Sequence, residues 1–92
     1  MKFNPGRLLM TRGVNDMVAD NEEFAKHVML SMKRHVAGDW GDVCDEDRVA
    51  NELALQLGDR LFSVYKKKGL GKIWIITEWD RSVTTTLFPE EY

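Results

Sequence analysis

Residues 60–88 read RLFSVYKKKGLGKIWIITEWDRSVTTTLF, and the pattern of this stretch decides the fold. β-branched and aromatic residues fill three runs within it, 60–66, 72–78 and 82–88. The segments between the runs, KKGLG and WDR, have the glycine and polar residues of short turns. The stretch therefore predicts three antiparallel strands joined in a meander.

The middle run, 72–78, is apolar at both of its alternating sets of positions. Ile73 and Ile75 form one set, and Trp74 and Ile76 form the other. Because alternate residues of a strand point to opposite faces, we expect this strand to lie in the centre of the sheet.

Upstream of the strands, the apolar period changes to that of helices. Asn15 can cap a short turn of helix, and Asn21 can cap a longer one that glutamates follow and Gly38 ends. The apolar stripe of this longer helix consists of Phe24, Val28, Met32 and Val36. A second helix starts between Asp42 and Asp45 and ends at Gly58. Its predicted core face consists of Val49, Ala50, Leu53, Ala54 and Leu57.

One further β-prone run, Arg7–Thr11, precedes the helices. The expected order is therefore β-α-α-β-β-β, a single α+β domain spanning residues 1–92. We expect an antiparallel sheet of three to four strands with both helices packed on one of its faces.

Composition narrows the setting of this domain. The chain has a net charge of -2 and one cysteine, Cys44, so it offers neither an internal disulfide nor the general positive charge of a nucleic-acid binder. Lys66, Lys67 and Lys68 suit a solvated hairpin turn better than a binding surface. Because no run is long and apolar enough to span a membrane, the sequence predicts a cytoplasmic protein that is neither exported nor membrane-embedded.

The acidic stretch 35–48, HVAGDWGDVCDEDR, raises the question of a metal or catalytic site. Its carboxylate spacing matches no calcium loop, and its acids suit the first turn of the following helix. His27 and His35 are too far apart along one helix for a facing pair, which leaves His35 and Asp39 as the best available dyad. With no nucleophile or phosphate-binding motif present, the sequence predicts no metal, no cofactor and no enzymatic activity.

Trp40 and Trp79 occupy predicted turns, where each can either fold back over the sheet or anchor a partner. The acids around Trp40 favour the second reading. The predicted protein-binding surface consists of Trp40, Trp79, Asp39, Asp42, Asp45 and Asp47.

Three stretches, RLLMTRGVND (7–16), VAGDWGDVCDEDRVANELAL (36–55) and KIWIITEWDRSVTTTLFPEEY (72–92), resemble a family of small uncharacterised proteins of bacterial plasmids, conjugative elements and prophages. Some of its members are labelled plasmid-related or type I restriction subunit M, although a chain this small has no room for a methyltransferase. The resemblance implies a mobile genetic element and counteraction of host defence, such as inhibition of restriction or CRISPR complexes. It implies no catalytic residues.

The expected strand order is also similar to that of RelE/ParE-type toxins, which implies RNA cleavage as an alternative function. His35 and Arg81 are the residues that this alternative would use. A homodimer is possible, but Pro89 and the acids after it would discourage strand pairing along the last strand if that strand formed an edge.

Overall fold

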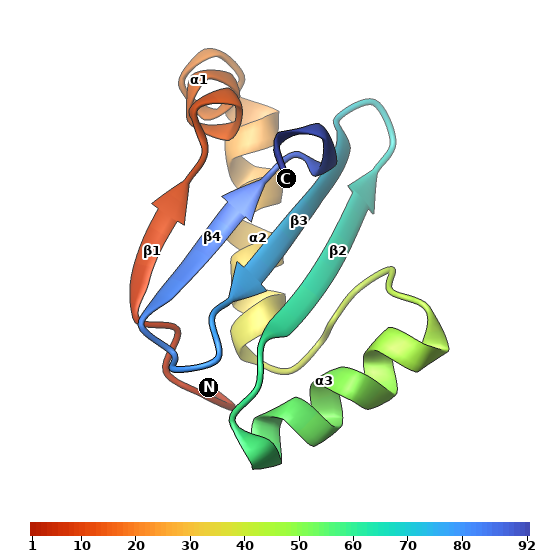
Figure 1. Cartoon of the computed structure of the whole chain (residues 1–92). Coiled ribbons are helices and arrows are strands. Elements are labelled where there is room, and N and C mark those ends of the chain that lie inside the picture. Colours follow the sequence, from red (N-terminus) through yellow and green to blue (C-terminus); the bar gives the residue numbers. More distant parts are fainter.

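The computed structural model describes residues 1–92 and confirms an α+β domain. Figure 1 shows its elements in chain order from red to blue. They are β1 (Arg7–Met10), α1 (Arg12–Asp20), α2 (Glu22–Val36), α3 (Asp45–Leu57), β2 (Leu61–Lys67), β3 (Gly71–Thr77), β4 (Val83–Leu87) and the short 3-10 turn η1 (Pro89–Glu91).

The sheet has the order β1-β4-β3-β2, so β1 and β2 are its two edges. The meander β2-β3-β4 is confirmed, with β3 pairing antiparallel to both neighbours. The prediction of a wholly antiparallel sheet is wrong, because β1 pairs with β4 in parallel, from Arg7 opposite Val83 to Met10 opposite Thr86. Side-chain alternation within a strand carries no information about the direction of the strand beside it.

Three long helices are present where two were expected. The short turn predicted at Asn15 is the nine-residue helix α1, and Asn21 is all that separates it from α2. The predicted cap is confirmed, because the Asn21 side chain accepts a hydrogen bond from the Phe24 N–H at 3.0 Å. No helix has the length and apolar character that crossing a bilayer requires.

Helix α2 covers one face of the sheet and lies behind it in Figure 1. Phe24 of α2 and Val14 of α1 form one of two core clusters with Tyr65, Ile73 and Ile75 of the strands. The opposite face of β2 and β3 carries Phe62, Val64, Trp74 and Ile76, which the strand register places side by side. Val64 and Ile76 are buried there, Val64 in a second core cluster with Trp40, Val43, Ala54 and Leu61. We call this face, which α2 does not cover, the open face.

Helix α3 lies beside β2 rather than over the face that α2 covers (Figure 1). The prediction that both helices share one face is therefore wrong, and of the predicted core face of α3 only Ala54 is buried. Val49, Leu53 and Leu57 are 67%, 53% and 71% exposed, whereas α3 buries only Asn51 and Ala54. A helix that runs along the edge of a sheet buries a narrower strip than one that lies across it.

Candidate functional site

Trp40 belongs to the core, so the prediction that it lies at the surface is wrong. Its side chain is 2% exposed, stacks on the ring of Phe3 and donates from Nε1 to Glu52 Oε2 at 2.7 Å. The sequence allowed this tryptophan either to fold back over the sheet or to anchor a partner, and in the structure the ring folds back.

Asp39 holds the turn between α2 and α3 in place. Its carboxylate accepts from Nε and Nη2 of Arg34 at 2.7 and 3.1 Å, and this pairing lowers the Asp39 pKa. Its main-chain oxygen accepts from the Tyr65 hydroxyl at 2.6 Å. Asp39 is therefore paired with Arg34, and it does not form the dyad with His35 that the sequence left as the best available one.

Asp42 and its neighbours close the outer edge of β2. Val64 donates its N–H to Trp40 O at 3.2 Å and accepts from the Asp42 N–H at 2.6 Å. The Asp42 carboxylate then accepts from the Lys66 N–H at 2.9 Å. Gly41, at φ +75°, allows this close approach, because a Cβ there would lie 2.1 Å from Val64 O.

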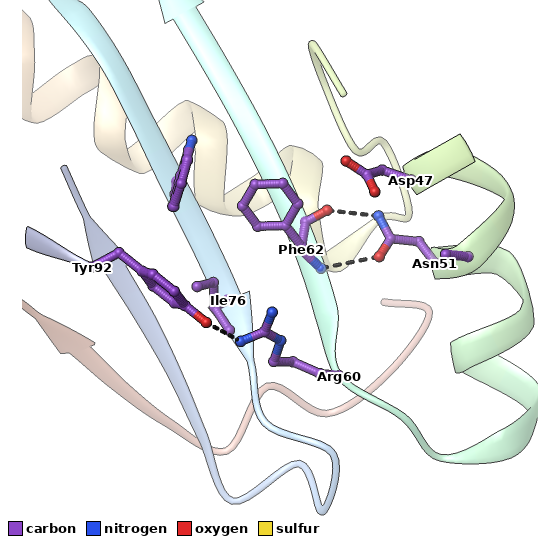
Figure 2. Close-up of a pocket in the computed structure, with 8 residues that line it drawn as sticks. Asp47, Asn51, Arg60, Phe62, Ile76 and Tyr92 are labelled. Atoms are coloured by element: carbon purple, nitrogen blue, oxygen red, sulfur yellow. Dashed lines mark hydrogen bonds between the residues drawn. The ribbon is translucent and has the colours of Figure 1, made fainter. Parts of the chain in front are cut away.

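Asn51 closes the same edge one position earlier, from α3. Its amide donates to Phe62 O at 2.6 Å and accepts from the Phe62 N–H at 3.0 Å, as Figure 2 shows. The outward-facing N–H groups at residues 62, 64 and 66 of β2 thus all have partners. Within the acidic stretch, Asp42 and the main chain of Trp40 therefore seal an edge of the sheet.

The remaining predicted partner-binding residues stay at the surface. Asp45 and Asp47 are exposed in the first turn of α3, and Trp79 is exposed in the turn between β3 and β4. Histidine, cysteine and acidic side chains form no group of three or more that could hold a metal ion.

The opposite edge of the sheet, β1, is open. Arg7 and Thr11 donate their N–H groups to Ser82 O at 3.0 Å and Thr86 O at 3.1 Å. Since alternate residues of a strand direct their main-chain groups to opposite sides, those of Leu8 and Met10 point away from the sheet. All four residues of β1 are exposed.

An apolar groove of about 330 Å³ runs between this open edge and α2. The groove is lined by Leu8, Leu9, Met10, Val28, Met29, Met32, Lys33 and Thr86. Leu8 and Met29 are 58% and 62% exposed on its rim, and Lys33 is its only charged lining residue. The Thr86 hydroxyl is buried there without a hydrogen-bond partner. We call this surface the β1 groove.

The side chains named for RNA cleavage are engaged elsewhere. His35 is fully buried between Ser63 Oγ, 2.6 Å from Nδ1, and Thr77 Oγ1, 2.9 Å from Nε2. Burial lowers its pKa to about 4. The Arg81 guanidinium donates to four main-chain oxygens, those of Ala54, Asp59, Glu78 and Trp79, and so ties the turn after β3 to the end of α3.

Sequence reasoning missed the β1 groove, although a signal for it exists. Leu8, Leu9 and Met10 are consecutive apolar residues, and Met29 lies beside the apolar stripe of the helix that Asn21 caps. These residues are more than one buried face needs, so some of them must lie at the surface. Where they gather could not be predicted without knowing which strand pairs with β1.

Comparison with protein-family models, with curated proteins and with solved structures gives no match to this chain.

Proposed function

We propose that the protein is a non-catalytic binding module and that a partner protein adds an extended segment to β1. The observation that carries this proposal is the contrast between the two sheet edges. One edge is sealed by Asn51, Asp42 and a main-chain bridge, whereas the other has unpaired main-chain groups beside an apolar groove. An uncovered edge is a template for pairing with another chain, and folded proteins commonly block such edges.

The groove defines the chemistry of the partner segment. The main-chain groups of Leu8 and Met10 can bond an incoming strand, and alternate apolar side chains of that strand can enter the groove. Lys33 in the groove and Arg7 in β1 form no ion pair within the protein. An acidic residue beside the apolar positions of the partner would complement them.

The same charges argue against a second copy of this chain as the occupant. In a symmetric antiparallel pairing centred on Leu9, Leu8 would face Met10 of the other copy and Arg7 would face Thr11. That register matches apolar residues but offers no acid to Arg7. A different protein therefore complements the edge better than a second copy does.

The resemblance to proteins of bacterial plasmids, conjugative elements and prophages supports a particular class of partner. We propose that the module acts for a mobile genetic element in the cytoplasm and that its partner is a host-defence complex, such as a restriction or CRISPR complex. Non-catalytic binding suits that role, because occupying a surface of such a complex is enough to inhibit it.

The proposal is tested by affinity capture from a bacterial host, followed by binding measurements with the captured partner. We expect the L8K/M29K double variant to reduce affinity at least about tenfold, because it places two charges in an apolar contact. Hydrogen exchange at the Leu8 and Met10 amides should slow when the partner binds, since these groups then acquire acceptors.

The matched control is the L53K/L57K double variant, which makes the same kind of change on the exposed side of α3. It should retain wild-type affinity. If the α3 variant loses the partner and the groove variant keeps it, β1 is not the docking edge. Unchanged exchange at Leu8 in the complex would also exclude strand addition.

A further inference from the structure

A second hollow lies on the open face of the sheet, remote from the β1 groove. It is a cleft of about 350 Å³, within the size range of sites for small ligands. Its lining residues are Asp47, Ala50, Asn51, Arg60, Phe62, Trp74, Ile76 and Tyr92. Figure 2 shows Tyr92 and Arg60 along one side, Asp47 and Asn51 of α3 along the other, and Phe62 and Ile76 between them.

Aromatic rings form much of this cleft. Trp74 meets Phe62 edge to face, with ring centroids 5.0 Å apart, and meets Tyr92 in the same way at 5.7 Å. Trp74 and Phe62 are only partly buried, and Tyr92 is exposed. The cleft therefore offers accessible aromatic surface to a flat ring, which stacking favours whatever the identity of that ring.

Arg60 brings a positive charge with unused hydrogen-bond donors. Its Nη1 donates to the Tyr92 hydroxyl at 2.8 Å, and the guanidinium lies 5.7 Å from the centre of the Tyr92 ring. It forms no ion pair with any carboxylate of the protein. A guanidinium held at one end in this way has the fork geometry that binds phosphate or carboxylate oxygens.

Asp47 supplies the opposite kind of group on the facing wall. Its carboxylate is exposed and forms neither an ion pair nor a side-chain hydrogen bond with another residue. It can accept hydrogen bonds from N–H groups of a ligand. Asn51 does not add to this recognition, because Phe62 occupies both ends of its amide.

We propose that the open-face cleft binds a nucleotide, with the base against the aromatic rings and the phosphate on Arg60. A flat heterocycle, an anionic group and N–H donors occur together in this class of ligand, and each has its counterpart in the cleft. The inference is independent of the β1 groove, which lies at the other edge of the sheet. The ligand is either a free nucleotide or one nucleotide of a single strand.

Two lysines on the open face distinguish these sources. Lys66 and Lys72 are directly opposite in the register of β2 and β3, on the same face as Trp74. Six positions along β2 separate Lys66 from Arg60, a span of roughly 20 Å in an extended strand. A strand lying across the face would contact Arg60 and these lysines, whereas a mononucleotide in the cleft would contact Arg60 alone.

The test is an NMR titration that follows the three tryptophan indole N–H signals. The probes are the ribonucleoside monophosphates, the corresponding nucleosides, inorganic phosphate and a short single-stranded oligoribonucleotide. We expect a monophosphate to shift the Trp74 signal and leave Trp40 unmoved, because the Trp40 indole is buried and bonded to Glu52. The R60Q variant should weaken binding at least about tenfold, as loss of a charge-assisted hydrogen bond predicts.

Matched controls separate the possible outcomes. R12Q changes an arginine of α1 that is outside the cleft, and it should leave the affinity unchanged. Tighter binding of the oligoribonucleotide that is lost in K66Q/K72Q identifies a strand, and equal binding unaffected by that variant identifies a free nucleotide. The proposal is overturned if no nucleotide probe shifts Trp74 at millimolar concentration, if inorganic phosphate binds as tightly as a monophosphate, or if R60Q binds as the wild type does.

Discussion

His35 joins three elements of the fold through hydrogen bonds. It connects α2 to Ser63 of β2 and Thr77 of β3. The Thr77 hydroxyl is 2.7 Å from that of Thr84 on β4, which in turn donates to Pro5 O at 2.7 Å. A polar chain of this kind stabilises a core while every member is satisfied, and burial keeps the imidazole at its centre neutral.

Protonation of His35 therefore couples stability to pH. Burial lowers its pKa from 6.5 to about 4, so the folded state binds this proton more weakly than the unfolded state does. The stability from neutral His35 is fully present above pH 6.5 and is lost as the pH falls from 6.5 to about 4. We expect a loss on the order of 3 kcal/mol across this window, measured by urea unfolding at a series of pH values.

A His35→Gln variant provides the comparison. It should be less stable at neutral pH, and its free energy of unfolding should change less across the same window. The slope that remains comes from His27, whose pKa is also lowered mainly by burial, and at the acidic end from Asp39 and Glu91, whose pKa values hydrogen bonds lower. A wild-type stability that stays constant between pH 6.5 and 4 would contradict this account.

Local residue roles were predictable where the partner is near in sequence. Asn21 caps α2, and Gly58 ends α3 at φ +74°, both as expected. The roles of Trp40 and Asp42 were not predictable, because their partners Glu52 and Val64 come from other elements. The local sequence, a tryptophan next to acids, does not distinguish a turn that is exposed to solvent from one that packs against a strand.

At the scale of elements, the two edges of the sheet differ, because hydrogen bonds cap the β2 edge and leave the β1 edge open. Asn51 is one of the residues that cap the β2 edge. Its amide reproduces the donor and acceptor of a neighbouring strand opposite Phe62. Asn51 is buried, so water cannot easily replace these bonds when the amide is removed.

We predict that Asn51→Ala lowers the free energy of unfolding by about 2 to 3 kcal/mol, since it leaves a main-chain donor and acceptor without partners. Denaturant unfolding measures the loss, and faster hydrogen exchange at the Phe62 amide localises it. Asn15→Ala, at an exposed helix position, is the matched control and should change stability by no more than about 0.5 kcal/mol. Equal effects of the two variants would show that Asn51 does not seal the edge.

Helix α3 shows the limit of periodicity as a guide to burial. The spacing of Val49, Leu53 and Leu57 predicted a helix correctly and its buried side wrongly. Period identifies residues that share a side, but what covers that side depends on where the helix docks. The strands were easier to predict, because a central strand with apolar residues on both faces has fewer alternatives.

At the scale of the whole molecule, charge and the open edge act together. The net charge is -2 and the sequence pI about 5.6, so mutual repulsion disappears under mildly acidic conditions. We expect self-association to increase near that pH, because weak repulsion between molecules then no longer prevents contact through the uncovered β1 and its apolar groove. Light scattering measures this association.

The L8K variant should suppress this association more than L53K does. Both substitutions add one positive charge, and both replace a leucine of similar exposure, 58% and 53%. The difference between them therefore isolates the contribution of β1. Equal suppression by the two variants would mean that net charge alone controls the association.

The overall architecture was predictable as α+β with a meander, but the placement of β1 was not. Its pairing with β4 joins residues near the two ends of the chain, and no local pattern encodes such a contact. The same pairing places the last strand of the meander in the interior of the sheet, so Pro89 and the acids after it do not protect an edge.

The β1-β4 pairing also has a consequence for the timing of folding. The β2-β3 hairpin and α2 can form before the last strand is made, but β1 has no partner until Val83–Leu87 leaves the ribosome. Pairing between distant segments is slow, because a long loop must close before any contact compensates for its lost entropy. A partner can therefore engage the paired β1 edge only after Val83–Leu87 has emerged from the ribosome.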